Sequence, residues 1–295
     1  MDNNVQQNSW KAWLLASRPK TLTAAFIPVV IATALAYSDG CFKLIPALLC
    51  LCFAGFMQIA ANFINDLFDY LRGTDCEDRL GPERACSQGW ITPKAMKVGV
   101  GLTVMVACMV GCLLLFYGGW WLISVGVLCV CFAFLYTTLL SYCGLGDLLV
   151  LVFFGLVPVA GTYYVQASAL TPSVWMTSIA CGLVIDTLLV VNNYRDRDTD
   201  KRVGKRTLIV FLGERFGRYL YVSVGLLACC CCALLAFEGR FFAAFLPFLY
   251  LVPHMFTWRR MVQIFSGKAL NGILGETSRN MLFFGILLSL GLLLS

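Results

Sequence analysis

Nine long apolar segments run along this chain, and they limit its fold more than any other feature. A helix needs roughly 20 predominantly apolar residues to cross the hydrocarbon core of a bilayer. Backbone groups inside a bilayer must be hydrogen-bonded within the protein, so each segment is expected to be helical. The expected spanning helices cover residues 21–38, 44–69, 95–117, 120–140, 146–167, 173–195, 217–236, 241–258 and 277–294.

The composition favours a membrane protein over a water-soluble one. Hydrophobic residues make up 60% of the chain and charged residues only 13%, whereas charged residues form about 25% of an average soluble domain. Fifteen cysteines lie mostly inside apolar segments, and we interpret them as small lipid-compatible side chains. We predict an all-α polytopic membrane protein of about nine transmembrane helices around a central cavity, forming a single domain over residues 1–295.

The basic residues indicate how this bundle is oriented. Of the 22 Lys and Arg residues, only Lys43 and Arg240 follow odd-numbered segments, and the other 20 lie before the first segment or after even-numbered ones. This asymmetry places the polar N-terminal segment 1–17 and the loops 70–94 and 196–216 in the cytoplasm, as expected for a cell (inner) membrane protein. Residues 1–17 lack the apolar region of a cleaved secretory signal. The net charge of +6 is explained by anionic headgroups and an anionic substrate, without nucleic acid.

Polar side chains with helical spacing lie at the C-terminal ends of the second and sixth segments. The first cluster holds Asn62, Asn65, Asp66 and Asp69, followed by Asp75. Side chains three or four positions apart share one face of a helix. Carboxylates this close to hydrocarbon usually mark a working site. The second cluster, with the same spacing, holds Asn192, Asn193, Asp196, Asp198 and Asp200.

Basic residues are interleaved with both clusters. Any one of these charges is explained equally well as a solvated loop residue, but the double arrangement favours a metal that holds an anionic substrate. Mg²⁺ prefers oxygen ligands and is often shared with substrate phosphates, while Arg and Lys bind phosphate directly. The residues concerned are Arg72, Arg79 and Arg84 beside the first cluster and Arg195, Arg197, Lys201, Arg202, Lys205 and Arg206 around the second.

Several runs of residues resemble motifs of one known family. Residues 65–69 (NDLFD), 73–75 (GTD) and 78–85 (DRLGPERA) look like the first motif of the UbiA superfamily of intramembrane aromatic prenyltransferases. The LGPERA run resembles the branch that prenylates 1,4-dihydroxy-2-naphthoate in menaquinone synthesis. Residues 192–202 (NNYRDRDTDKR) and 204–208 (GKRTL) are similar to the same branch. So are residues 17–22 (SRPKTL) and, with Asp147 where Glu is usual, residues 142–147 (YCGLGD).

The resemblance implies a polyprenyl diphosphate and a dihydroxynaphthoate as substrates, a lipid bilayer as surroundings and Mg²⁺ as cofactor. The expected metal ligands are Asn65, Asp66, Asp69, Asn192, Asp196 and Asp200. The expected catalytic residues are Asp69, Asp196, Asp200 and Lys201. The expected diphosphate-binding residues are Lys20, Arg72, Arg84, Arg195, Lys201, Lys205 and Arg206. The expected substrate pocket contains Asn62, Tyr136, Tyr142, Asp147, Asp186, Asn193 and Asn271.

Asp186 allows two interpretations, because it lies well inside the sixth segment. It either lines the cavity or hydrogen-bonds a neighbouring helix, and we favour the second. Two other functions also remain open. One is prenylation of a different aromatic acceptor, such as hydroxybenzoate, homogentisate or haem, and the LGPERA run argues against it. The other is a membrane transporter, but transporters commonly place polar groups near the bilayer midplane, whereas these clusters lie at one face.

Overall fold

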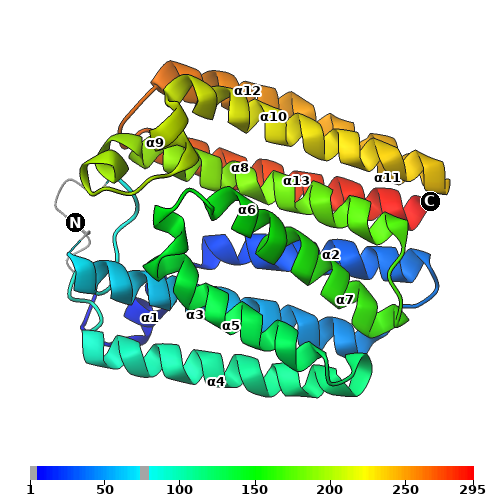
Figure 1. Cartoon of the computed structure of the whole chain (residues 1–295), viewed down its shortest axis with the longest axis horizontal. Coiled ribbons are helices and arrows are strands. Elements are labelled where there is room, and N and C mark those ends of the chain that lie inside the picture. Colours follow the sequence, from blue (N-terminus) through cyan, green and yellow to red (C-terminus); the bar gives the residue numbers. More distant parts are fainter. Residues whose placement is uncertain (1–4, 74–79) are drawn as a thin grey trace.

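The computed structural model describes residues 5–73 and 80–295, which form helices and connecting loops without a β-strand (Figure 1). The first half contains α1 (Trp10–Ser17), α2 (Pro19–Ser38), α3 (Leu44–Arg72), α4 (Pro93–Gly118), α5 (Leu122–Thr138), the 3₁₀ turn η1 (Leu140–Tyr142), α6 (Gly146–Val150), the π-helix η2 (Leu151–Leu156) and α7 (Val157–Ala167). The second half contains α8 (Pro172–Arg202), α9 (Leu208–Leu212), α10 (Glu214–Ala233), η3 (Leu234–Glu238), α11 (Phe241–Phe245), η4 (Leu246–Tyr250), α12 (Leu251–Ile264) and α13 (Leu270–Leu294).

The nine predicted spanning segments each coincide with a helical stretch. Within the described residues, eight stretches are long and apolar enough to cross a membrane, and the ninth, α5, has 17 residues. Three crossings are stacks of shorter pieces, namely α6–η2–α7, α10–η3 and α11–η4–α12. The prediction of an all-α, multi-spanning membrane protein is therefore confirmed.

Several helices extend further than their apolar segments predict, among them the two that carry the polar clusters. The helix α3 continues to Arg72 and ends at Gly73, whose φ of 65° suits a glycine cap. The helix α8 has 31 residues and continues to Arg202, so the start of the expected loop 196–216 is helical. At 1.5 Å per residue such a helix is about 46 Å long, longer than the roughly 30 Å hydrocarbon core. Its charged last turns can therefore project beyond the apolar layer.

The core of the bundle is built on α2, α8 and α13, which are the most buried spanning helices. Small residues let α8 approach the π-helix η2 closely. A Cβ atom added to Gly155 of η2 would lie 2.6 Å from the Ser178 carbonyl oxygen and 2.7 Å from the Gly182 Cα. Close backbone contact through small residues is typical of membrane helix interfaces. It holds α6 and η2 against the middle of α8.

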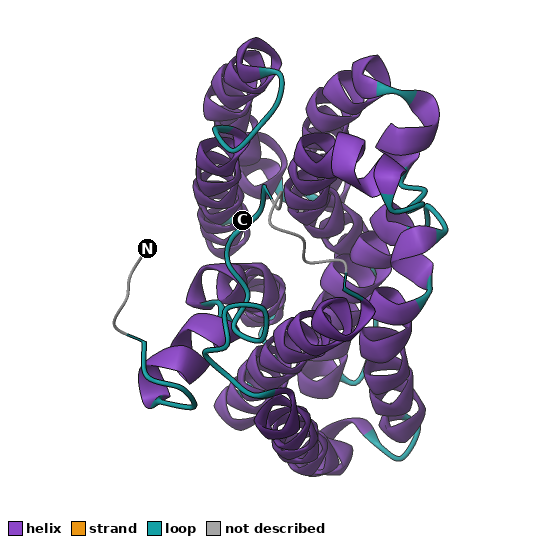
Figure 2. Cartoon of the chain, turned by 90° about the vertical axis from the view of Figure 1, so that its left-hand side faces the viewer, coloured by secondary structure: helices purple, strands orange, loops and turns teal. Residues whose placement is uncertain are grey.

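The first half of the bundle encloses an apolar cavity of about 520 Å³. Its walls come from α2, α3, α4, α5, η2, α7 and α8. Both α3 and α8 run in the same direction, and their C-terminal ends lie at the end of the molecule that carries α1 and α9 (Figure 1). Figure 2 views the bundle from this end, with the spanning helices seen nearly along their axes. The two predicted polar clusters thus share one end of the bundle.

The opposite end of the bundle is closed by a polar cluster around Arg240. This guanidinium forms an ion pair with Asp39 and donates hydrogen bonds to Ser38 Oγ (2.8 Å) and Ser173 Oγ (3.3 Å). The Tyr163 hydroxyl donates to the other Asp39 oxygen at 2.6 Å. Arg240 is one of the two basic residues that depart from the charge asymmetry, and the Asp39 carboxylate neutralises it. These contacts also link α2, α7, α8 and the start of α11.

Candidate active site

The two polar stripes meet at the head of the apolar cavity. Asn65, near the end of α3, and Asn192, near the end of α8, both line this cavity. The carboxylates of Asp69, Asp196 and Asp200 follow at helical spacing toward the end of the molecule. A mainly apolar chamber therefore leads directly to a charged rim, as a lipid-tailed anionic substrate requires.

Each of the three rim carboxylates is matched with a cation. Asp69 forms an ion pair with Arg84. Asp196 receives two hydrogen bonds from the Arg195 guanidinium, at 2.7 and 2.6 Å. Asp200 lies 3.5 Å from the Lys205 ammonium group. The predicted metal ligands and the predicted diphosphate ligands are thus already in contact with one another.

Asn271 connects the second stripe to the loop that follows the first. Its Oδ1 accepts a hydrogen bond of 2.8 Å from Arg195, and its Nδ2 donates one of 2.7 Å to the Leu80 carbonyl oxygen. Asn271 lies in the first turn of α13. It therefore orients a rim cation and holds the loop in place, a more specific arrangement than the pocket lining that was predicted.

Asp66 has a different environment from its neighbours in the first stripe. It is 1% exposed, and its two carboxylate oxygens accept hydrogen bonds from the backbone N–H groups of Ala85 (2.8 Å) and Cys86 (2.9 Å). Both oxygens are turned toward the loop. These two hydrogen bonds anchor the loop against α3, and metal ligation by Asp66 stays a prediction.

Arg72 fastens the end of α5 to the end of α3. It donates to the carbonyl oxygens of Thr137 (3.1 Å) and Thr138, and its guanidinium lies 5.0 Å from the centre of the Tyr142 ring. The Thr137 hydroxyl donates to Asn65 Oδ1. Arg72 and Tyr142 are therefore near the rim, as predicted, and Thr137 is a site residue that no sequence signal identified.

Some residues of the two clusters face away from the rim. Arg197 stacks on the rings of Tyr194 (4.6 Å) and Phe265 (4.8 Å), so it packs α8 against α12. The Asp198 side chain is 75% exposed. Asn62 donates to the Ser17 carbonyl oxygen at 2.9 Å and so holds the junction between α1 and α2, and its predicted substrate contact stays a prediction.

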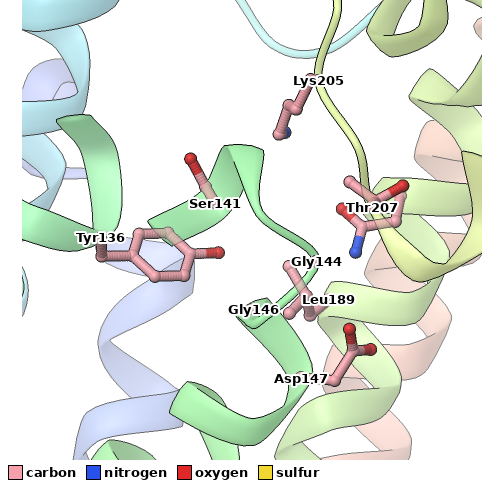
Figure 3. A pocket seen from close by; sticks show the side chains of 9 residues that line it. Tyr136, Ser141, Gly144, Gly146, Asp147, Leu189, Lys205 and Thr207 are labelled. Atoms are coloured by element: carbon pink, nitrogen blue, oxygen red, sulfur yellow. The ribbon is translucent and has the colours of Figure 1, made fainter. Parts of the chain in front are cut away.

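A second, smaller pocket adjoins the rim (Figure 3). Tyr136 lines both this pocket and the large cavity, so it marks the passage between them. Figure 3 shows its hydroxyl pointing into the pocket, with Asp147 across from it and Lys205 above. The polar lining residues are Tyr136, Ser141, Asp147, Asn193, Lys205 and Thr207. Ser141 and Thr207 were not among the predicted site residues, although Thr207 belongs to the GKRTL motif.

The remaining basic residues of the predicted site lie at the same end of the bundle as the rim. Lys20 lies in the first turn of α2, Lys201 in the last turn of α8 and Arg206 in the following loop, and all three are exposed. The Arg206 backbone N–H donates to the Tyr142 carbonyl oxygen at 3.2 Å. Four residues of the motifs lie outside the described residues, namely Thr74, Asp75, Asp78 and Arg79.

The rim suits a hard cation by the chemistry of its donors, which are carboxylate and amide oxygens. Asn192 donates through Nδ2 to the Leu188 carbonyl oxygen and lines the cavity, so its Oδ1 is a candidate metal ligand. Over residues 5–73 and 80–295, no three Asp, Glu, His or Cys side chains gather into a metal cluster. The stripes would therefore bind a metal only once the carboxylates exchange their present cationic partners.

Comparison with known proteins agrees with this arrangement. The sequence matches the UbiA prenyltransferase family over residues 25–269. It is 36% identical to the 1,4-dihydroxy-2-naphthoate octaprenyltransferase of Escherichia coli (strain K12), covering 97% of this chain and 96% of that protein. The fold resembles the apo structure of a UbiA homolog from Aeropyrum pernix K1 (TM-score 0.70, 18% identity, 92% and 97% covered). It also resembles a UbiA homolog from Archaeoglobus fulgidus bound to GPP and Mg²⁺ (TM-score 0.63, 14% identity, 96% and 100% covered).

Proposed function

The chain belongs to the UbiA prenyltransferase family, and from this premise we propose that it transfers a polyprenyl group from polyprenyl diphosphate to 1,4-dihydroxy-2-naphthoate. CO₂ and diphosphate leave, and the product is a demethylmenaquinol for menaquinone biosynthesis. The observation that carries the proposal is the junction of an apolar cavity with a rim of carboxylates and cations. The identity of 36% to a naphthoate prenyltransferase over nearly the whole chain supports the choice of acceptor.

The two ends of the prenyl substrate need opposite environments, and the cavity and its rim offer both. The isoprenoid tail fits the apolar cavity, whose lining includes Phe53, Phe132 and Phe153. The diphosphate belongs at the rim, where Arg84, Arg195 and Lys205 lie beside the carboxylates. Lys20, Arg72, Lys201 and Arg206 supplement this positive charge. Arg is suited to bidentate phosphate contacts.

Asn65, Asp69, Asn192, Asp196 and Asp200 are the residues that would hold Mg²⁺ in this assignment. Bound Mg²⁺ would supply positive charge that stabilises the leaving diphosphate. A neighbour in the same fold was solved with GPP and Mg²⁺, which supports the choice of metal. The cations released from the carboxylates then have the diphosphate oxygens as new partners.

The protein's own residues contribute charge stabilisation and exclusion of water. As the allylic C–O bond breaks, its electrons pass to the diphosphate, whose growing charge Arg84, Arg195 and Lys205 stabilise. The electron-rich naphthoate ring forms the new C–C bond at the carbon that bears the carboxylate. The C–C bond to the carboxylate then breaks, its electron pair returns to the ring, and CO₂ leaves. The apolar cavity walls keep water from the allylic cation.

The protein is an integral membrane protein, and we place it in the cell (inner) membrane with the rim at the cytoplasmic face. The distribution of basic residues supports this orientation. Diphosphate substrates are made in water, and a cytoplasmic rim would receive them without moving charge across the bilayer.

The test uses protein in vesicles with octaprenyl diphosphate, 1,4-dihydroxy-2-naphthoate and Mg²⁺, and detects the prenylated product by mass spectrometry. We expect turnover by the wild type, its loss on chelation of Mg²⁺, and a fall of at least about a hundredfold in Asp69→Ala and Asp196→Ala. Asp198→Ala is the matched control on α8, because its side chain is 75% exposed.

Two results would contradict the proposal. If Asp69→Ala or Asp196→Ala retains wild-type turnover, the assignment of these carboxylates as metal ligands is wrong. If the wild-type protein does not prenylate the naphthoate but prenylates hydroxybenzoate or homogentisate, the assignment of the acceptor is wrong. The assignment of prenyl transfer would still hold.

A further inference from the structure

The carboxylate of Asp186 lies inside a membrane-spanning helix without an evident structural purpose. The residue is 4% exposed, and its Oδ1 has no hydrogen-bond partner among the described residues. The hydrogen bond to a neighbouring helix favoured above is therefore not made by this oxygen. A buried polar group without a partner is costly, and carboxylates within membrane helices usually serve a function.

The position of Asp186 on α8 directs it toward the smaller pocket. Leu189 and Asn193 follow it by three and seven residues, so all three share one face of the helix. Both of these residues line the smaller pocket. Ile185, next to Asp186, lines the large apolar cavity. Leu189 lines both spaces, so Asp186, which lines neither, lies one helical turn before the place where the polar pocket and the apolar cavity adjoin.

Two other polar groups face the same space from different helices. Asp147 of α6 lines the pocket, and its charge acts on Asp186. The Tyr136 hydroxyl is within electrostatic range of both carboxylates. The backbone comes close here as well, because a Cβ atom added to Gly146 would lie 3.9 Å from that hydroxyl. Two carboxylates and one phenol therefore converge beside an apolar wall.

The chemistry of this space selects among possible ligands. A diphosphate is disfavoured by the two carboxylates, and a small cation is disfavoured by the ammonium group of Lys205, which Figure 3 shows pointing into the pocket. A neutral hydroxyl donor on an apolar ring fits both the acceptor oxygens and the adjoining cavity.

We propose that Asp186 and Asp147 accept hydrogen bonds from the ring hydroxyls of the aromatic acceptor, and so select a dihydroxy ring and turn its reacting carbon toward the rim. This inference rests on the proposed function, because it assigns the acceptor half of that reaction. Accepting these hydrogen bonds also raises the electron density of the ring that forms the new C–C bond. No proton is gained or lost overall.

The test measures separate KM values for the two substrates with Asp186→Asn and Asp147→Asn. We expect the KM for 1,4-dihydroxy-2-naphthoate to rise about tenfold or more, because a buried acceptor oxygen is replaced by an NH₂ group and its hydrogen bond is lost. The KM for octaprenyl diphosphate should stay within about twofold, since the rim is intact. Thr187→Val is the matched control, because Thr187 is on the same helix but faces Tyr250 of η4.

Acceptor analogues make the test specific for hydrogen bonding. With 1-hydroxy-2-naphthoate or 4-hydroxy-2-naphthoate, the penalty of Asp186→Asn should shrink for the analogue that lacks the hydroxyl it binds. Equal penalties for all three acceptors, or equal rises in both KM values, would overturn the inference. If Asp186→Asn does not fold, the same comparison with Asp147→Asn decides. Wild-type turnover of the dihydroxynaphthoate is measured alongside, so failure of the proposed function is recognised separately.

Discussion

Neighbouring carboxylates of one stripe can have unrelated tasks, as Asp66 and Asp69 demonstrate. They lie three residues apart on α3, yet Asp66 binds backbone N–H groups of Ala85 and Cys86 while Asp69 pairs with Arg84. Spacing predicts that both share a face of the helix, but it does not reveal which partner the distant loop supplies. The same reasoning applies to Arg197, whose two ring partners come from α8 and from the end of α12.

Asp66→Asn should therefore affect stability more than catalysis. An asparagine presents an NH₂ group to one of the two backbone donors, and we expect a loss of about 1–3 kcal/mol in the free energy of unfolding. Asp69→Asn should show the reverse pattern, because Asp69 is a proposed metal ligand, while the asparagine Oδ1 can still accept a hydrogen bond from Arg84. Thermal unfolding and turnover, measured on both variants below their unfolding temperatures, check this. If Asp66→Asn leaves the stability unchanged but abolishes turnover, this prediction is wrong and Asp66 acts as a metal ligand.

At the scale of elements, the apolar pattern predicts the spanning helices well but not where the charged ones end. Each of the nine segments contains a helix, because hydrocarbon leaves the backbone no other partner. The extension of α8 from the predicted end at residue 195 to Arg202 was missed, because a run of charges resembles a loop. The contacts of Asn271 and Thr137 were also out of reach, since they join residues 191 and 72 positions apart.

The contact between η2 and α8 gives a prediction about packing. Gly155→Ala places a methyl group against the Ser178 carbonyl oxygen and the Gly182 Cα, so the helices must separate. We expect a loss of about 1–3 kcal/mol in stability, with a raised KM for the naphthoate because Asp147 moves with η2. Gly101→Ala in α4 is the control, since an added Cβ there meets nothing within 4 Å. Equal unfolding temperatures for both variants would contradict the close-contact argument.

At the scale of the whole molecule, the described residues contain eight candidate spans and the shorter apolar helix α5, and we expect these to make nine crossings between the two ends of the chain. The helix α1 lies at the rim end of the bundle and Ser295 at the other (Figure 1). With the rim in the cytoplasm, a fluorescent protein fused before α1 should fluoresce, and alkaline phosphatase fused after Ser295 should be active in a bacterial host. An inactive phosphatase at Ser295, with a fluorescent C-terminal fusion instead, would require an even number of crossings.

The paired charges of the rim have a thermodynamic consequence for how the substrates load. Asp69, Asp196 and Asp200 are each held by a cation, so a metal arriving alone displaces cations that have no new partner. A diphosphate arriving alone leaves carboxylates without theirs. When both arrive, every charge exchanges one partner for another, so each ligand should increase the affinity for the other by the same factor. The rim should therefore bind the complete metal–diphosphate complex more tightly than it binds the metal or the diphosphate alone.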